Sequence, residues 1–439
     1  MILPTWEEVI DQYEEEDLFH AEERITGYRP GGFPPVSIGD IYNDRYEVFN
    51  KLGWGGFSTV WLAFDESTEE WVALKILRAE ASQDSRELRA YQRLADLELS
   101  QPEEWRKISS LFVQLRDHFF HQGPNGNHLC LVTELLGPRL SLVLEKLSDD
   151  HDRWLSPDMV LKVARKLLEA IDVLHRSGFA HGDLNMNNIA FTCHRMISSQ
   201  ANEATEATEA TEANEASENN EATEASENNE ASEADELTGD RIWDEIAGSR
   251  CRKLVRRDGR PVGPSVPEEY VAAESWDDWN DEEFEDVKIL DLGDLFSQQE
   301  QPGTCALPYD CRPPEFIFED SFDHRSDLWQ VGCASQPPKI YKLVFHMYPF
   351  MAMGENRLLV LTMMSILGDL PKEWIPRWES IQQDSDPKLP KLDPESTFIH
   401  TRQTNHSFFQ VSSGLMVGSI PVAACALAEC IQRMQISVH

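Results

Sequence analysis

The sequence predicts an α+β protein in which an antiparallel β-rich N-terminal part precedes a mainly helical C-terminal part that is divided by an acidic insert. Three observations lead to this fold class. Strand-like segments joined by short turns follow one another within residues 46–77, and a long amphipathic helix begins near residue 157. A tract of low complexity, in which glutamate recurs among alanine, threonine, serine and asparagine, fills residues 201–236.

The N-terminal part is expected to be an antiparallel meander. Three segments rich in β-branched, aromatic and aliphatic residues, 46–52, 59–64 and 71–77, are separated by a glycine-rich turn and a polar turn. Short turns favour antiparallel pairing, because parallel strands need a long crossover connection. A helix over residues 85–97 and a strand pair near 112–119 and 129–134 are predicted to follow.

The C-terminal part begins with a helix whose start and end are both marked in the sequence. Ser156 is a favourable N-cap, Pro157 suits the first helical position, and Asp158 puts negative charge in the first turn. Apolar residues then recur at helical spacing until Gly178 ends the pattern. A long helix with one apolar face indicates a part built from packed helices.

Acidic segments account for most of the chain's charge. The 439 residues carry a formal net charge of −39, and residues 201–236 hold 13 acidic residues and no basic one. Nine acidic residues within 1–24 and eight within 271–286 supply most of the rest. Glutamate at every third position drifts around a helix, so no apolar face forms, and the tract cannot offset the entropy of becoming ordered.

These patterns divide the chain into six segments. An acidic, Gly/Pro-rich lead-in, expected to be extended, is followed by a β-rich lobe, by two parts of a helical lobe with a disordered spacer between them, and by a tail of unknown fold. In chain order the predicted segments are residues 1–40, 41–136, 137–192, 193–285 (the spacer), 286–383 and 384–439.

Composition and charge exclude several classes of protein. A polyanionic chain is unsuited to holding nucleic-acid phosphates and favours basic partners instead. The eight cysteines include no C-x-x-C pair, which argues against a zinc site or a disulfide framework. The N-terminus lacks the pattern of a signal peptide, and the most apolar run, residues 415–428, is too short to span a bilayer. A soluble intracellular protein that binds neither nucleic acid nor membrane is expected.

The first chemical motif is a glycine-rich turn followed by a lysine-bearing strand. Gly53 and Gly55 lie between Leu52 and Val60, and Lys75 ends a Val-Ala-Leu-Lys segment. Glycines let the backbone approach a phosphate chain, Val60 would cover a flat ring, and the lysine would reach the phosphates. A glycine-rich turn alone is also compatible with a plain hairpin, but the coupled lysine favours phosphate binding.

Two further motifs with chemically active residues follow the long helix. The segment His181-Gly-Asp-Leu-Asn-Met-Asn-Asn188 has the spacing H-x-D-x-x-x-x-N, in which Asp183 would accept a substrate hydroxyl proton and Asn188 would hold a metal ion. An apolar strand then ends at Asp291 in Asp-Leu-Gly, where the carboxylate would bind Mg²⁺. Each motif alone is also compatible with a polar loop, but three in this order favour a common function.

With these motifs the sequence resembles the eukaryotic protein kinases and, more closely, the SR-protein-specific kinase family in its fungal form. Trp54 in the glycine-rich turn and the Asp-Leu-Gly motif are similar to that family's pattern. Residues 131–137 resemble the family's hinge, in which Thr133 would take the gatekeeper position and Glu134 would face the adenine. The insert lies where that family carries its spacer. The resemblance covers residues 25–192 and 286–380 and implies a bilobal protein kinase fold.

The resemblance assigns roles to individual residues. Lys75 would pair with Glu87, Asp183 would be the catalytic base, and Asn188 and Asp291 would bind Mg²⁺. The residues that would contact ATP are Leu52, Gly53, Gly55, Val60, Ala73, Lys75, Thr133 and Glu134.

The resemblance also implies a reaction and its partners. The activity would be ATP- and Mg²⁺-dependent phosphorylation of serine or threonine in Arg/Ser-rich splicing or RNA-processing factors, by a monomer in the cytoplasm and nucleus. Glu315 would close the activation segment, and Asp327 would brace the catalytic loop. The acidity suits a basic substrate, although it lies mostly outside the catalytic motifs. A basic cluster at 250–260 is compatible with both a nuclear-localisation signal and a solvated linker.

Departures from the family pattern support a second interpretation, a pseudokinase or truncated paralogue that acts as a binding scaffold. Gly182 replaces the usual arginine, and Asn185 stands where most serine/threonine kinases have a lysine. Pro337 and Pro338 interrupt an expected helix, and no kinase-like end of the C-terminal lobe is recognisable beyond residue 384. The complete set of retained catalytic and metal-binding residues weighs against this interpretation.

Overall fold

The computed structural model describes several stretches of the chain and divides it into two units. The described residues are 22–149, 155–193, 251–276, 286–300, 312–332, 356–367 and 369–383. Unit 1 comprises Met1–Ser85, Gln114–Gly137 and Thr192–Glu285, and unit 2 comprises Arg86–Val113, Pro138–Phe191 and Asp286–His439. Residues 86–113, predicted within the β-rich lobe, therefore belong to unit 2. The predicted tail 384–439 and the interrupted helix at 334–339 lie outside the described residues.

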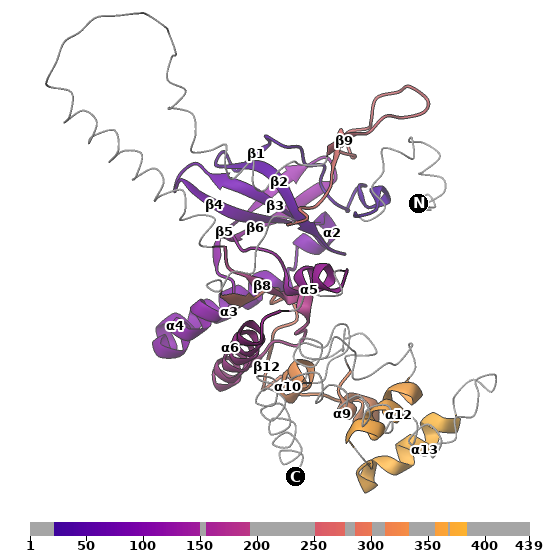
Figure 1. Cartoon of the computed structure of the whole chain (residues 1–439). Coiled ribbons are helices and arrows are strands. Elements are labelled where there is room, and N and C mark those ends of the chain that lie inside the picture. Colours follow the sequence, from indigo (N-terminus) through magenta and orange to yellow (C-terminus); the bar gives the residue numbers. More distant parts are fainter. Residues whose placement is uncertain are drawn as a thin grey trace, which may run out of the picture. The chain divides into compact units, whose positions relative to one another are not determined.

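Unit 1 is built on a six-stranded antiparallel sheet in the order β1-β2-β3-β4-β6-β5 (Figure 1). Its elements are η2 (Ile25–Gly27), β1 (Ile41–Tyr42), β2 (Tyr46–Trp54), β3 (Ser58–Asp65), β4 (Glu70–Leu77), α2 (Ala79–Ser82), β5 (Leu115–Gly123) and β6 (Gly126–Glu134). The predicted meander is confirmed, because β2, β3 and β4 pair consecutively. The strand predicted over 112–119 begins only at Leu115, because Phe112 and Val113 bond to Ile289 in unit 2.

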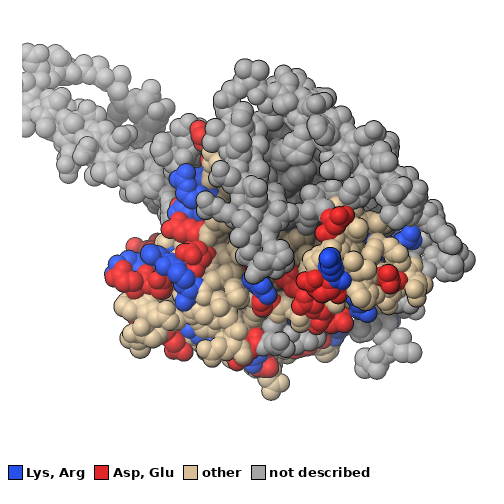
Figure 2. Space-filling view, turned by 90° about the horizontal axis from the view of Figure 1, so that it is seen from below, with Lys and Arg blue, Asp and Glu red and all other residues tan. Residues whose placement is uncertain are grey.

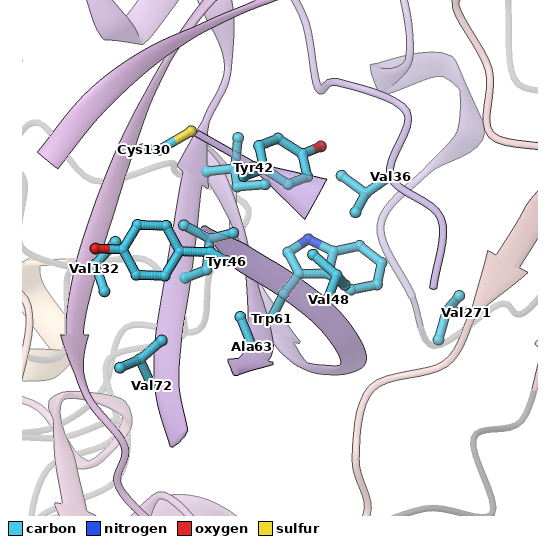
Figure 3. Close-up of a cluster of buried hydrophobic side chains, with 12 residues drawn as sticks. Val36, Tyr42, Tyr46, Val48, Trp61, Ala63, Val72, Cys130, Val132 and Val271 are labelled. Atoms are coloured by element: carbon cyan, nitrogen blue, oxygen red, sulfur yellow. The ribbon is translucent and has the colours of Figure 1, made fainter. Parts of the chain in front are cut away.

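The strand register separates the two faces of this sheet. On one face, Trp61 of β3, Leu74 of β4 and Val132 of β6 lie next to one another in a single row. They belong to a buried apolar cluster, the sheet core, which Tyr42 and the distant Val271 help to complete (Figure 3). Side chains alternate along a strand, so the neighbouring residues of the same strands point to the opposite face.

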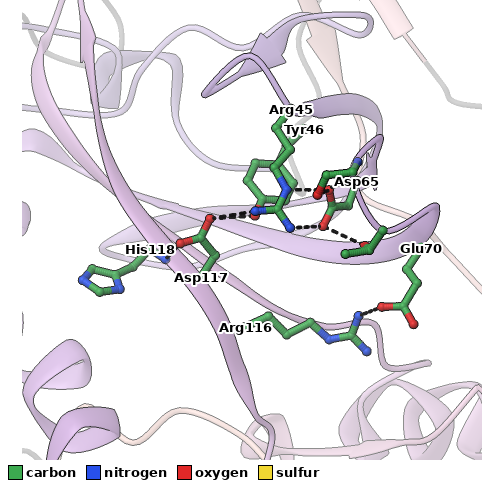
Figure 4. A network of polar contacts seen from close by, with 9 residues as sticks. Arg45, Tyr46, Asp65, Glu70, Arg116, Asp117 and His118 are labelled. Carbon is green, nitrogen blue, oxygen red and sulfur yellow. Dashed lines mark hydrogen bonds and ion pairs between the residues drawn. The ribbon is translucent and has the colours of Figure 1, made fainter.

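A polar network joins three strands of the sheet (Figure 4). The Arg45 guanidinium, in the turn before β2, donates to both carboxylate oxygens of Asp65 at 2.6 and 2.7 Å. It also lies 3.5 Å from Asp117 of β5, which accepts a 2.8 Å hydrogen bond from the Tyr46 hydroxyl. The bidentate contact with Arg45 holds the pKa of the Asp65 carboxyl well below its usual range. The network thereby ties the start of β2 and the end of β3 to β5.

Part of the predicted spacer is ordered. Within residues 251–276, β9 (Cys251–Lys253) pairs with β10 (Glu269–Val271). Residues of this segment and of the predicted extended lead-in share one buried apolar cluster, Ile25, Tyr28, Phe33, Leu254 and Tyr270. The prediction of a disordered spacer over 193–285 is therefore wrong for residues 251–276, because the lead-in supplies the apolar partners that the segment lacks. Residues 194–250 and 277–285 lie outside the described residues.

Unit 2 is mainly helical. Its helices are α3 (Arg86–Ser100), α4 (Pro102–Leu111), α5 (Leu140–Asp149), α6 (Pro157–Arg176), η3 (Met186–Asn188), α9 (Pro314–Glu319), α10 (Arg325–Gly332), α12 (Asn356–Leu367), η5 (Lys372–Trp374) and α13 (Ile375–Gln383). Its short strands are β7 (Phe179–Ala180), β8 (Ile189–Phe191), β11 (Val287–Ile289) and β12 (Phe296–Ser297). The predicted start of α6 is confirmed, because Ser156 Oγ accepts a hydrogen bond from the Met159 N–H at 3.2 Å. The helices α4 and α5 were not predicted.

Charged side chains of both signs are interspersed on the face of the described residues that Figure 2 shows. Figure 2 shows Lys and Arg beside Asp and Glu, with uncharged residues between them. The run of 13 acidic residues at 201–236 lies outside the described part of the chain. Among the residues that the structure describes, no helix combines the length and the apolar character that crossing a bilayer requires.

Candidate functional site

The strand register brings predicted nucleotide-binding residues of unit 1 onto one face of the sheet. Gly53 pairs with Val60, and Val60 pairs with Lys75, so these three residues form a row across β2, β3 and β4. In a parallel row, Ala73 of β4 pairs with Thr133 of β6. Because side chains alternate along each strand, both rows point away from the sheet core. Five of the predicted residues thus share one surface.

The turn between β2 and β3 leaves open backbone beside this surface. The Gly55 N–H donates to the Ser58 carbonyl at 2.8 Å, and a Cβ built at Gly55 would meet nothing within 4 Å. Leu52 lies at a register shift just before Gly53 and packs against a small apolar cluster that includes Leu62. A phosphate chain can therefore approach the turn without displacing protein atoms.

The side chain of Glu134 does not point to this surface. Glu134 pairs with Val72, whose side chain belongs to the sheet core. The Glu134 Oε1 atom accepts a 2.9 Å hydrogen bond from the N–H of Gln114, the residue that precedes β5. The Glu134 carboxylate thus lies on the opposite face of the sheet from the predicted nucleotide-binding residues. The predicted contact with an adenine would have to come from the Glu134 backbone.

In unit 2, the loop between β7 and β8 brings the predicted base and a predicted metal ligand together. The half-buried carboxylate of Asp183 accepts hydrogen bonds from the side-chain amides of Asn188 and Asn185, at 3.2 and 3.0 Å. Asn188 also donates to the Asp183 carbonyl at 2.8 Å. Asn185 therefore supplies a neutral hydrogen-bond donor at a position where a lysine would supply a positive charge.

Asp327 of α10 fixes the start of the same loop. Its fully buried carboxylate accepts hydrogen bonds from the N–H groups of His181 and Gly182, at 2.8 and 2.9 Å, and lies 2.9 Å from His175 Nε2. Burial by itself would raise the pKa of the Asp327 carboxyl. The contact with His175, the nearby His181 and the hydrogen bond from the Gly182 N–H favour the charged form instead, so the pKa is lowered. Asp327 thus occupies the bracing position that the sequence predicts.

Strand pairing brings Asp291 close to Asn188. β8 begins directly after Asn188 and pairs with β11, and the Leu290 N–H donates to the Asn188 carbonyl at 2.8 Å. Asp291 follows with a φ of 56°, in the left-handed region, and its exposed side chain accepts a 3.2 Å hydrogen bond from the Gly293 N–H. The two predicted metal ligands therefore lie at the end of one short ladder.

The chemistry of these groups fits Mg²⁺. Burial, with the nearby carboxylates of Asp183 and Asp291, raises the pKa of Asp294, a residue outside the predicted motifs. This accumulation of negative charge favours a cation, and amide and carboxylate oxygens are the ligands that Mg²⁺ prefers. Within the described residues no cluster of three or more His, Cys, Asp or Glu side chains forms a complete metal site.

Two further predicted residues lie in the first turns of helices. Glu87 is buried in the first turn of α3, within unit 2, whereas Lys75 belongs to unit 1. The ion pair between them stays a prediction. Glu315 lies in the first turn of α9, where burial raises the pKa of its carboxyl.

Comparisons with known proteins agree on one domain. Residues 46–198, which include Lys75, Asp183 and Asn188 but not Asp291, match the family described as protein kinase domain. A solved crystal structure of a kinase domain resembles the chain with a TM-score of 0.50, covering 84% of this chain and 86% of that one. At 16% sequence identity this likeness shows the fold alone, which is that of a protein kinase.

Similar curated proteins are kinases related to the SR-protein kinases. The serine/threonine-protein kinase spk-1 of Caenorhabditis elegans is 36% identical over 177 residues, 40% of this chain and 17% of that protein. Protein kinase dsk1 of Schizosaccharomyces pombe is 39% identical over 175 residues, 38% of this chain and 30% of that protein. SRSF protein kinase 3 of Homo sapiens is 35% identical over 187 residues, 42% of this chain and 32% of that protein. The chain therefore aligns with less than half the length of each of these relatives.

Proposed function

We propose that this chain, whose residues 46–198 match the protein kinase domain and whose relatives are SR-protein kinases, is a serine/threonine protein kinase that transfers phosphate from ATP to protein hydroxyls. The observation that carries the proposal is the hydrogen bond between Asp183 and Asn188 beside the ladder that ends at Asp291. The proposed base and the proposed metal ligands are therefore neighbours within unit 2.

Asp183 is the proposed general base. Asn185 and Asn188 both donate to its Oδ2 atom, which leaves Oδ1 to accept the proton of a substrate hydroxyl. The neighbouring amides also restrict the carboxylate's rotation, so that Oδ1 keeps one direction.

Asn188 and Asp291 are the proposed metal ligands, and Lys75 the proposed phosphate ligand. The Asn188 amide nitrogen is committed to Asp183, so its oxygen is the atom available to a cation. When bound, Mg²⁺ would neutralise charge on the phosphates of ATP. Lys75 shares its sheet surface with Val60 and the glycine-rich turn, which supports the proposed nucleotide site in unit 1.

The proposed substrates are Arg/Ser-rich proteins that take part in splicing or RNA processing. This part of the proposal draws on the resemblance to kinases such as SRSF protein kinase 3 of Homo sapiens. The net charge of −39 is compatible with a basic substrate, since fields of opposite sign attract. The proposed location of the protein, cytoplasm and nucleus, draws on the same resemblance.

Label transfer from radioactive ATP to an Arg/Ser-repeat peptide tests the function. The wild-type protein should label the peptide, and Asp183→Asn, which keeps the shape of the side chain but not its basicity, should lower kcat by about 10²- to 10⁴-fold. Asp172→Asn is the matched control, because Asp172 is an exposed aspartate of α6 whose carboxylate pairs with Arg176 of the same helix. Nucleotide binding without any label transfer by the wild type would overturn the proposal in favour of a scaffold.

A further inference from the structure

A residue that the motifs do not contain, Gln330, bonds to the backbone on both sides of Asp183. Gln330 lies on α10 three residues after Asp327, and therefore on the same side of that helix. Its Oε1 atom accepts a 2.6 Å hydrogen bond from the Leu184 N–H, and its Nε2 atom donates to the Gly182 carbonyl at 3.2 Å. Gln330 is completely buried. One planar amide thus joins the peptide groups before and after the proposed base.

Asp327 and Gln330 together hold the backbone of residues 181–184. Asp327 accepts hydrogen bonds from the first two N–H groups of this stretch. Gln330 donates to the carbonyl of Gly182 and accepts from the N–H of Leu184. The remaining N–H, that of Asp183, donates to the His181 ring at 3.3 Å. Buried backbone groups are costly when unpaired, so the loop depends on these two side chains of one helix.

Position 182 has no room for a side chain that could hold the loop in place. Gly182 has a φ of 84°, and a Cβ at this position would lie 2.5 Å from the Asp294 carbonyl oxygen. Glycine is also the residue with the greatest backbone freedom, so the peptide before Asp183 would otherwise be the loosest in the loop. The contact from Gln330 restrains the loop at that point from the neighbouring helix.

We infer that Gln330 is a positioning residue for phosphoryl transfer, because it sets the direction of the Asp183 carboxylate by holding the peptide groups that flank it. The inference rests on the proposed function of Asp183 as the base. An apolar side chain of the same length could make neither hydrogen bond. A glutamate could accept from the Leu184 N–H but, when ionised, could not donate to the Gly182 carbonyl.

Two variants and two measurements test the inference. In Gln330→Met the amide hydrogen of Leu184 should exchange about 10-fold faster or more, because it loses its buried acceptor. The same variant should lower kcat by about 10- to 100-fold while the KM for ATP changes little, because a misdirected base affects the transition state and not nucleotide binding. In Gln330→Glu the Leu184 amide should stay protected while kcat still falls. This variant separates the two hydrogen bonds and serves if Gln330→Met does not fold.

Val331→Ala is the matched control, because Val331 is fully buried on the same helix and is apolar. It should lower stability without changing kcat or the protection of Leu184. Unchanged exchange at Leu184 in Gln330→Met would overturn the inference, and so would faster exchange with an unchanged kcat. If the wild-type protein transfers no phosphate, the proposed function fails, and the exchange measurement alone decides whether Gln330 holds the loop.

Discussion

Gly182 and Gly178 have nearly the same backbone conformation but different surroundings. Their φ angles are 84° and 86°, in the left-handed region where a Cβ is disfavoured. A Cβ at Gly178 would meet nothing within 4 Å, whereas a Cβ at Gly182 would lie 2.5 Å from the Asp294 carbonyl oxygen. The glycine at position 182, a departure from the family pattern, is therefore required by its neighbour as well as by its own dihedral angle.

The different surroundings of Gly178 and Gly182 predict different losses of stability when each glycine is replaced by alanine. Gly178→Ala should lower the free energy of unfolding by about 1–2 kcal/mol, the cost of the left-handed conformation. Gly182→Ala should lower the free energy of unfolding by about 1–3 kcal/mol more than Gly178→Ala does, because the backbone of Asp294 must move. Urea unfolding of both variants measures the difference. Equal losses would contradict the close approach of Gly182 and Asp294.

At this scale the motifs predicted contacts between residues that are near one another in sequence, and the family resemblance predicted one distant support, Asp327, but not the other, Gln330. Asp183 and Asn188 lie within one loop, so their spacing alone predicts a contact. Gln330 lies 146 residues from Leu184, and its role depends on which backbone groups the helix approaches. The one available signal was its position three residues after Asp327, on the same side of a predicted helix.

A buried ionic cluster joins elements of unit 1 that are far apart in sequence. Lys51 of β2 is completely buried and pairs with Glu22 at 2.9 Å and with Glu23. Its Nζ atom also donates to the Val271 carbonyl at 3.1 Å, and Glu22 accepts from the Ala273 N–H at 2.9 Å. We call these residues the Lys51 cluster. It fastens the lead-in and the ordered end of the spacer to the sheet.

Removing the lysine should weaken this attachment strongly. Lys51→Met would leave two buried carboxylates without their cation, which should cost about 3–5 kcal/mol of unfolding free energy. Trypsin should then cleave faster after Lys253, because β9 loses its anchor. Arg116→Met, which removes an exposed ion pair with Glu70, should cost about 1 kcal/mol or less. Similar losses in both variants would contradict a structural role for the Lys51 cluster.

The elements that the sequence predicted well are those whose pattern is local. The alternation within β2, β3 and β4 and the cap at Ser156 need no distant partner to be recognised. Residues 251–276 were missed because their polar composition indicates a linker, and the apolar partners of Tyr270 lie in the lead-in. The lead-in itself was assigned an extended conformation for the same reason. Each segment is interpretable only with the other.

At the scale of the whole molecule, the net charge of −39 is distributed unevenly. Residues 201–236 hold 13 acidic residues, whereas both signs are interspersed on the described surface in Figure 2. A charge carried by a separate tract acts on a substrate mainly through long-range attraction. Salt limits that attraction, because the screening length is about 8 Å at physiological ionic strength.

The acidic tract should therefore affect substrate encounter mainly at low salt. Replacing its 13 acidic residues by glutamine or asparagine keeps its length and removes its charge. At physiological ionic strength the KM for an Arg/Ser-repeat peptide should rise by no more than about 3-fold, with kcat unchanged, whereas at low ionic strength the rise should be clearly larger. Steady-state kinetics at two salt concentrations measure this, with an uncharged serine peptide as the control substrate. A rise in KM of about 10-fold or more at physiological ionic strength would instead make the tract a docking site that contacts the substrate directly, since screened long-range attraction could not produce it.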